Sequence, residues 1–217
     1  MKIRNDQPFY LQGKGKNILT SEIIDHFFIQ NPELNNWRSL SPNLILRTLN
    51  ISTFESFVYW IISQVISGKT AKTIIQQVNY YFNKQNLPLT PESFLSMSDH
   101  MLIELGISRL KIKYIRNVAE FLQQNGELSL KSMRTAEIIK YYTQIKGIGE
   151  WSVQMHLIFV IGRLDIYSPK DLVVRKGIQR LYGLDNIPNE SLARKFCKSW
   201  GELSTIGTIL SWAVMGE

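Results

Sequence analysis

Two glycines separated by one residue, Gly147 and Gly149, constrain the fold of this chain more than any other feature. Residues 136–142 before them and residues 151–161 after them carry apolar side chains at helical spacing, and the second stretch is long enough for a mostly buried helix. Glycine permits backbone angles that a Cβ forbids, and it leaves the N–H groups at the start of the following helix open to an anion. The sequence therefore predicts two helices joined by a tight turn that can contact an anion.

A lone aspartate, Asp171, follows the second helix after a Ser168-Pro169 turn. Taken alone, an Asp at this kind of position is most often a helix N-terminal residue that the helix dipole favours. A glycine turn taken alone is equally unspecific, since many helix pairs turn on glycine. The turn, the tryptophan after it (Trp151) and Asp171 at this spacing form a much more specific combination.

This combination resembles the helix-hairpin-helix superfamily of DNA base-excision glycosylases, and within it the AlkA-type alkylbase glycosylases. The matching positions are residues 145–151 and 169–171, and the resemblance extends over roughly residues 30–215. It implies that the hairpin holds the DNA backbone and that Asp171 is the catalytic carboxylate. It also implies a structural monovalent cation on backbone carbonyls of the hairpin, and no other cofactor. The carbonyl donors by position are those of Thr143, Ile145 and Gly147.

The resemblance assigns further positions at the end of a strongly periodic helix predicted over residues 54–65. Gln64 and Val65 take the places of a glutamine and of an apolar wedge that enters the base stack. From spacing alone, Gln64 would be a partly exposed polar residue near a helix end. The predicted base pocket comprises Trp151, Gln64, Met155, Leu203 and Trp60, and the predicted DNA contacts are Lys146, Gly147, Ile148, Gly149, Ser152, Val65, Arg109 and Lys111.

Trp151 indicates the type of reaction. Superfamily members that also cut the DNA strand carry a lysine at this place, and it forms a Schiff base. An indole cannot form that adduct, but it can stack on a base or line a pocket. We therefore expect a monofunctional glycosylase in which Asp171 stabilises the positive charge that develops on the sugar while water attacks. A glycosylase for deaminated or oxidised bases, or a non-catalytic DNA-binding protein, stays open as an alternative.

The charge distribution also points to DNA. Residues 105–180 hold thirteen Lys or Arg and six Asp or Glu, which accounts for the whole net charge of +7. The helix that begins after Ser108, a predicted N-cap, carries part of this charge; it either lies beside the DNA or presents a solvated charged face. The predicted partner is double-stranded DNA with damaged bases, bound by a monomer.

Cysteine content and hydropathy exclude several classes. The one cysteine, Cys197, rules out an internal disulfide and a four-cysteine iron-sulfur cluster, and we expect it to be a buried structural thiol. No stretch approaches the ~20 apolar residues needed to cross a bilayer, and residues 1–6 contain no apolar signal core. We expect a cytoplasmic protein of bacterial type, associated with the nucleoid and not with a membrane.

Helical spacing recurs along the chain, and no segment shows convincing strand alternation, so we expect an all-α fold. It should consist of two helical lobes with an active-site cleft between them. One lobe is predicted to contain residues 1–53 and 163–217, and the other, residues 54–162, to carry the hairpin. Ser21 is expected to cap a first helix, and Pro169 to lie in the first turn of the helix at Asp171.

Overall fold

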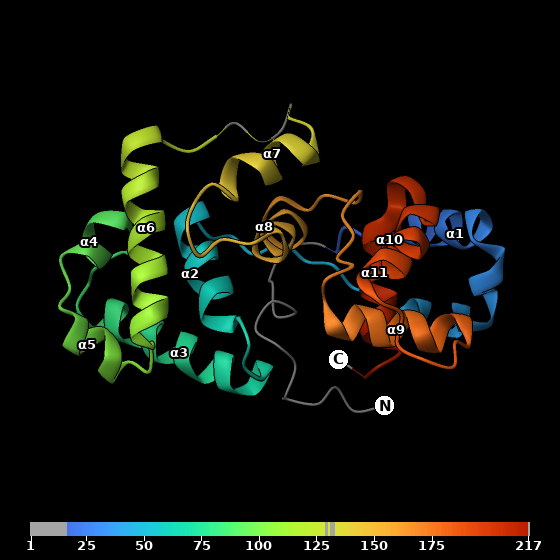
Figure 1. Cartoon of the computed structure of the whole chain (residues 1–217), viewed down its shortest axis with the longest axis horizontal. Helices are drawn as coiled ribbons and strands as arrows, with labels where there is room; N and C mark the ends of the chain where they lie inside the picture. Colours follow the sequence, from blue (N-terminus) through green and yellow to red (C-terminus); the bar gives the residue numbers. More distant parts are fainter. Residues whose placement is uncertain (1–16, 129, 131–132, 217) are drawn as a thin grey trace. The chain divides into compact units, whose positions relative to one another are not determined.

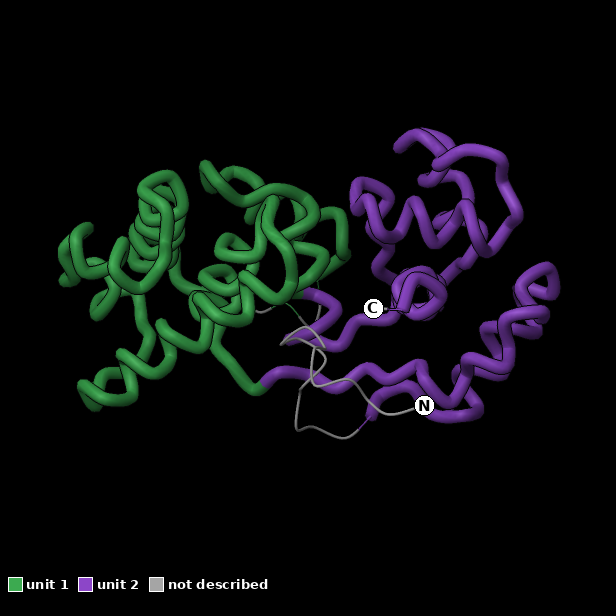
Figure 2. Tube along the Cα trace, turned by 90° about the horizontal axis from the view of Figure 1, so that it is seen from below, with its two compact units in different colours: residues 1–9, 50–156 green, residues 10–49, 157–217 purple. Residues whose placement is uncertain are grey.

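The computed structural model describes residues 17–128, 130 and 133–216. These residues form two compact units (Figure 2). The first unit holds residues 50–156, and the second holds residues 17–49 together with residues 157–216. The chain thus enters the first unit once and returns to the second.

The predicted all-α fold class is confirmed. Over the described residues, regular structure consists of helices, and the β-type pairing is limited to one antiparallel bridge between Asn17 and Arg47. The physical reason is the recurrent spacing of apolar residues at three and four positions, which gives each helix one stripe to bury.

In the described part of the first unit, seven α-helices follow one another (Figure 1). They are α2 (Thr53–Ser63), α3 (Gly68–Lys84), α4 (Pro91–Leu95), α5 (Asp99–Glu104), α6 (Arg109–Asn125), α7 (Thr135–Tyr142) and α8 (Glu150–His156).

Helix α2 forms the centre of the first unit, where it packs against α3, α6 and α8 (Figure 1). Ser52 caps its start, because the Ser52 hydroxyl accepts the N–H of Glu55 at 3.1 Å. Apart from Glu55, every residue from Thr53 to Ile62 is buried, so this helix is apolar on nearly all sides. The last turn of α2, which leads to Gln64, is therefore held in the core of the first unit.

The second unit combines helices from both ends of the described chain. It contains α1 (Ser21–Gln30), the 3-10 stretch η2 (Pro32–Asn43), the π-helical turn η4 (Leu157–Ile161), α9 (Leu172–Tyr182), α10 (Glu190–Ser199), the 3-10 turn η5 (Gly201–Leu203) and α11 (Ser204–Ala213).

Helices α9 and α11 cross at a glycine. A Cβ on Gly177 would lie 2.3 Å from the backbone oxygen of Ser211, so the two helix backbones touch at this point. Gly207, also in α11, packs against the fully buried ring of Trp200, and a Cβ on Gly207 would lie 2.2 Å from the Cδ2 of that ring. Close backbone contact through glycine therefore fixes α9, the helix that follows Asp171.

Several predicted helix starts are confirmed and others need correction. Ser108 does cap α6, and the helices predicted on both sides of the hairpin are present as α7 and α8. The cap of α1, however, is Thr20 and not Ser21, because it is the Thr20 hydroxyl that accepts the N–H of Ile23. Pro169 lies before the N-cap of α9, outside its first turn, because the chain remains extended at Asp171.

The helix predicted to run through residues 151–161 changes type within its length. It is an α-helix up to His156 and continues as a π-helical turn from Leu157 to Ile161. Arg163 then donates its N–H to the carbonyl of Leu157 at 2.9 Å and ends the turn. Apolar spacing predicts burial here but does not distinguish the two helix types, since the change needs only one extra residue in a turn.

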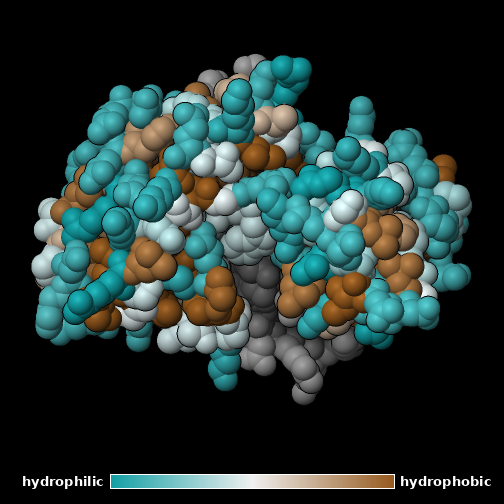
Figure 3. Space-filling model, viewed as in Figure 1, coloured by the Kyte–Doolittle hydropathy of each residue, from teal (hydrophilic) through white to brown (hydrophobic). Residues whose placement is uncertain are grey.

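The surface carries hydrophilic residues over most of the face in Figure 3, with apolar residues in small separate groups. Across the described ranges, none of the helices is long and apolar enough to cross a membrane.

Cys197 is buried as expected, and burial raises the pKa of its thiol to about 12. A thiol with so high a pKa is inert, which fits a purely structural role.

Candidate functional site

The hairpin between α7 and α8 is built from short backbone bonds. Ile145 donates its N–H to the carbonyl of Tyr142 at 3.1 Å, and Ile148 donates to the carbonyl of Ile145 at 3.0 Å. Ile145 and Ile148 are buried and anchor the turn in the core, whereas Lys146 and Gly149 are exposed. The alternation of buried and exposed residues presents the turn to solvent without loosening it.

The two glycines of the hairpin have different functions. Gly147 has a φ of +108°, and a Cβ there would lie 2.3 Å from the Cγ of Tyr114. Gly149 has no left-handed φ, and a Cβ there would meet no atom within 4 Å. Of the two properties that the sequence analysis ascribed to these glycines, Gly147 therefore uses the backbone angle that a Cβ forbids, whereas Gly149 leaves its backbone open and has room for a ligand.

The side chain of Gln64 ties the end of α2 to the hairpin. Its Nε2 donates to the carbonyl of Gly147 at 3.0 Å and to the Oγ of Ser152 at 3.1 Å. Ser152 is itself buried in the first turns of α8. Gln64 thus lies at the hairpin, among the residues with which the sequence grouped it, and its amide supports the turn.

Val65 follows directly and adopts an unusual conformation. Its φ is +58°, and its side chain is fully exposed. A β-branched residue rarely adopts a left-handed φ, because its Cβ branches collide with the backbone. An apolar side chain held in a strained turn and directed into solvent has the properties expected of a wedge.

The basic residues of α6 divide into two groups. Arg109 is exposed at the first position of the helix. Lys111 is half-buried and donates its Nζ to the carbonyl of Ile62 at 2.8 Å, and burial lowers the pKa of this ammonium. Arg116 bonds the carbonyl of Met97 at 2.8 Å and the carboxylate of Asp99 at 2.7 Å. Two of the basic side chains of α6, Lys111 and Arg116, therefore form hydrogen bonds within the protein.

Trp151 is half-buried at the start of α8 and rests on a polar network inside the first unit. Its ring meets Trp60 edge to face, with the centroids 6.2 Å apart. Trp60 is fully buried, and its indole N–H donates to the Oγ of Ser56 at 2.9 Å. Of the two tryptophans that the sequence assigned to the base pocket, Trp151 reaches solvent and Trp60 lies beneath it.

His156 continues this network and was not identified from the sequence. Its Nδ1 lies 2.9 Å from the Oγ of Ser56, and its ring stacks on Phe57 with centroids 5.2 Å apart. Its Nε2 has no hydrogen-bond partner among the described residues. Complete burial lowers the pKa of His156 to about 4, so the ring is neutral at physiological pH. Because His156 stands among apolar residues at helical spacing, the sequence does not indicate that it is buried and bonded to Ser56.

The other two predicted pocket residues lie in different units. Met155 belongs to α8 of the first unit and is buried, with 1% of its surface exposed. Leu203 ends the 3-10 turn η5 of the second unit and is half-buried. Met155 therefore belongs to the core of its unit, whereas Leu203 retains some solvent contact.

Asp171 is the N-cap of α9. Its Oδ1 accepts the N–H of Val173 at 2.7 Å and that of Val174 at 3.2 Å. The residue is half-buried. Two charge-assisted bonds from the start of a helix fix the carboxylate in one orientation. Asp165, the nearest other acid before it, is engaged instead by Arg163, whose Nε lies 2.9 Å from its Oδ1.

The carbonyls predicted to hold a monovalent cation belong to the hairpin. That of Gly147 accepts the Gln64 amide, and that of Ile145 accepts the N–H of Ile148. A carbonyl oxygen has two lone pairs, so each can take a second partner. Neutral oxygen donors in a turn suit a hard monovalent cation, so the carbonyls of Ile145 and Gly147 fit by donor type the ion that the resemblance implies.

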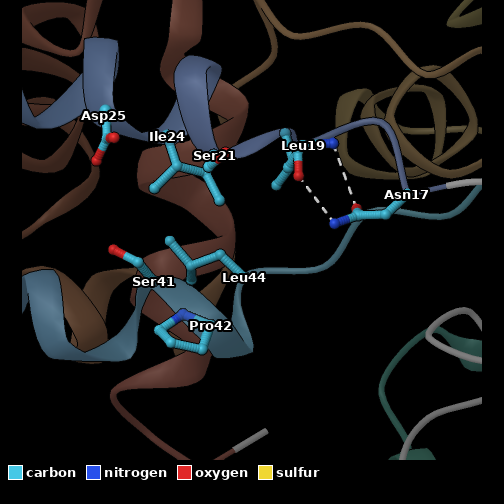
Figure 4. Close-up of a pocket in the computed structure, with 8 residues that line it drawn as sticks. All are labelled: Asn17, Leu19, Ser21, Ile24, Asp25, Ser41, Pro42 and Leu44. Carbon is cyan, nitrogen blue, oxygen red and sulfur yellow. Dashed lines mark hydrogen bonds between the residues drawn. The ribbon is translucent and has the colours of Figure 1, made fainter.

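A hollow in the second unit lies apart from all predicted site residues (Figure 4). The Asn17 side chain crosses its rim, donating to the carbonyl of Leu19 at 2.8 Å and accepting the Leu19 N–H at 3.3 Å. Its lining consists of Asn17, Leu19, Ser21, Ile24, Asp25, Ser41, Pro42 and Leu44. With Asp25 paired to Arg38, the hollow offers no converging set of reactive groups.

Comparison with known proteins identifies a family over most of the chain. A model described as the HhH-GPD superfamily base excision DNA repair protein matches residues 58–202. DNA-3-methyladenine glycosylase 1 of Schizosaccharomyces pombe is 29% identical over 163 residues, which cover 73% of this chain and 71% of that protein. The putative DNA-3-methyladenine glycosylase YfjP of Bacillus subtilis is 25% identical over 171 residues, covering 76% of this chain and 59% of that protein.

Solved structures agree with this family. A DNA-3-methyladenine glycosidase from Bacillus halodurans is 28% identical and superposes with a TM-score of 0.74, covering 93% of this chain and 92% of the other. The 3-methyladenine DNA glycosylase Mag1 of Schizosaccharomyces pombe, solved in complex with abasic DNA, is 25% identical with a TM-score of 0.74 and covers 96% of each chain.

Proposed function

Because the chain belongs to the HhH-GPD superfamily of base excision DNA repair proteins, we propose that it is a DNA glycosylase that hydrolyses the N-glycosidic bond of alkylated, 3-methyladenine-like bases. The observation that carries the proposal is a Gly-x-Gly hairpin followed, within the matched residues, by a carboxylate fixed at a helix start. It acts as a monomer on damaged duplex DNA. A base inside a duplex is out of reach of side chains, so the nucleotide must first leave the stack, which costs least at a damaged pair.

The hairpin serves to hold the DNA backbone during this step. Gly149 offers bare, exposed backbone at the start of α8, and Lys146 adds a positive charge beside it. Contacts of this kind bind phosphate without reading sequence, as a repair enzyme requires. The backbone carbonyls of Thr143, Ile145 and Gly147 would hold a monovalent cation, which would add positive charge for a phosphate at the hairpin. Val65, exposed at the end of α2, fills the gap that the displaced nucleotide leaves.

Asp171 supplies the chemistry. Breaking the glycosidic bond places positive charge on the sugar, and a fixed carboxylate stabilises that charge without having to reorganise. The two N–H bonds to its Oδ1 provide this fixation. Asp171 also orients the water that attacks the sugar. In the first unit, the exposed part of Trp151 offers an aromatic face to an electron-poor alkylated base, and Trp60 beneath it keeps that face in place.

The decisive test is incubation of the protein with duplexes that each carry one defined lesion, scored by release of the free base. Release of 3-methyladenine-type bases supports the proposal. Release of deaminated or oxidised bases alone would show that the protein is a glycosylase for those bases and not for alkylated ones. Binding to every duplex without release of any base would indicate a DNA-binding protein without catalytic function.

Binding to undamaged duplex is expected to weaken steeply with salt, because residues 105–180 hold the whole charge surplus. The slope of log affinity against log salt should be about −0.9 for each phosphate neutralised. Lys146→Glu should lower the affinity for all duplex sequences alike. The matched control is Lys84→Glu, which makes the same change at an exposed lysine at the end of α3 and should have a smaller effect. Affinities that are flat from low to physiological salt would argue against a DNA partner.

The product is expected to be an intact abasic strand that breaks only after added alkali or heat. Strand cleavage by a glycosylase requires an amine at the sugar carbon, and the chain carries Trp151 where such an amine would stand. Borohydride should therefore trap no covalent complex with DNA. Lys170 adjoins Asp171, but its Nζ lies 4.0 Å from the carboxylate of Glu190 in an ion pair. A trapped complex that disappears in Lys170→Ala would show that this lysine is a nucleophile.

A further inference from the structure

Three side chains on successive turns of α6 hold the two segments that the proposed function assigns to DNA. Lys111, Tyr114 and Asn117 are spaced by three residues, so they follow one side of the helix. One segment, residues 62–65, comprises the last two residues of α2 and the two that follow it, and the other is the hairpin, residues 145–149. Each of the three side chains contacts one of these segments at its backbone.

Lys111 holds the end of α2. Its Nζ donates to the carbonyl of Ile62 at 2.8 Å, in the last turn of that helix. Carbonyls in the last turn of a helix have no partner within the helix, and the helix dipole makes them favourable sites for a cation. Val65, with its φ of +58°, stands three residues further along the chain.

Tyr114 and Asn117 hold the hairpin. The Tyr114 ring covers Gly147 so closely that a Cβ would lie 2.3 Å from its Cγ. Asn117 donates its Nδ2 to the carbonyl of Lys146 at 2.8 Å. Gln64 closes the arrangement by bonding the carbonyl of Gly147 from the end of α2.

We propose that α6 is a clamp that fixes the separation between Val65 and the hairpin, with Lys111, Tyr114 and Asn117 as positioning residues. A wedge side chain enters the base stack efficiently only when it lies at a set distance from the phosphates that the same protein holds. A wedge displaced by even about 1 Å no longer faces the gap between the bases, and its effect is reduced. Lys111 therefore acts on DNA through Val65 and not through a phosphate. Partial burial of its ammonium, which lowers its pKa, agrees with this role. The effect of the clamp on entry of Val65 into the base stack rests on the proposed function, whereas the contacts of the clamp are a property of the free protein.

Hydrogen exchange in the free protein tests the clamp directly. Lys111→Met keeps the aliphatic stem and removes the donor, and it should accelerate exchange in residues 60–67 on the order of 10-fold, the effect of losing one charge-assisted hydrogen bond. Lys111→Arg retains a donor and should restore protection. The control Lys113→Met removes the same charge from an exposed position of the same helix and should leave exchange in residues 60–67 as in wild type.

A second variant addresses the other arm of the clamp. Asn117→Leu keeps the size of the side chain but cannot donate to the carbonyl of Lys146, so exchange should accelerate in residues 144–149. Unchanged exchange in both variants would overturn the clamp. An increase spread equally over α3 and α9 would also overturn it, because it would mean that these residues support stability in general.

The DNA arm uses duplexes with 2-aminopurine next to an abasic-site analogue. Lys111→Met should reduce the fluorescence rise on binding several-fold while retaining the salt slope of wild type. A slope smaller by about 0.9 would show that Lys111 contacts a phosphate and would overturn its positioning role. A wild-type protein that binds no DNA would contradict the proposed function, and the exchange experiment would still decide the clamp.

Discussion

Asp171→Asn is expected to bind lesion-containing DNA about as well as wild type and to release the base at least about 100-fold more slowly. This magnitude is that of removing one preorganised electrostatic group from an active site. The amide has nearly the shape of the carboxylate but no negative charge to set against the developing cation on the sugar. Single-turnover release of free base, with affinity measured in parallel, separates the two effects.

The local structure makes this substitution informative, because Asn caps helices about as well as Asp. The amide oxygen can still accept the N–H groups of Val173 and Val174, so α9 should start at the same residue. Asp165→Asn is the control: it changes a nearby acid that is paired with Arg163 and should retain base release. Release at a near wild-type rate by Asp171→Asn would remove Asp171 from the catalytic role.

Gly147→Ala should lower the free energy of unfolding by about 3 kcal/mol, from a strained backbone and an overpacked contact together. The φ of +108° disfavours any residue with a Cβ, and the nearest atoms are the Cγ and Cβ of Tyr114 at 2.3 and 2.4 Å. These atoms lie close to the α6 backbone and cannot swing away as the end of a long side chain can. Urea denaturation measures the loss.

Gly149→Ala provides the matched comparison within the same motif. A Cβ there meets nothing within 4 Å, so stability should fall by less than about 1 kcal/mol, while the bare backbone for a phosphate is lost. In a Tyr114→Ala background, the cost of Gly147→Ala should fall by about 1 kcal/mol, since the contacts with the ring disappear while the Cβ of residue 114, at 2.4 Å, and the backbone strain remain. Equal costs at both glycines would contradict the division of their functions.

The hydrophobic pattern was sufficient to predict the class of fold and most helices. The spacing of residues 54–65 predicts α2, although the helix ends at Ser63 because Val65 adopts a left-handed φ. Ser108 predicts the start of α6, because capping of free N–H groups is a local effect. Helix ends were less accurate. Thr20 caps α1 in place of Ser21, since adjacent hydroxyl residues are equivalent until the direction of the preceding chain is known.

Candidate site residues could be found from the sequence, but their contacts could not. Gln64, Trp151 and Asp171 were identified by position in a motif. That the Gln64 amide holds Gly147, or that Trp60 is buried beneath Trp151, depends on which helices lie side by side. His156 shows the limit most clearly, since its bond to Ser56 joins residues a hundred positions apart.

By itself the sequence determined the all-helical class, the glycine turn and the basic region around it, because each follows from local spacing or composition. Only the tertiary structure decided how these parts are used. It distinguished Gly147, which the Tyr114 ring crowds, from Gly149, which is open, and it directed the ammonium of Lys111 to the carbonyl of Ile62. The physical reason is that a residue's local preferences depend on its neighbours in the chain, whereas contact and burial depend on residues that packing brings close from far along it.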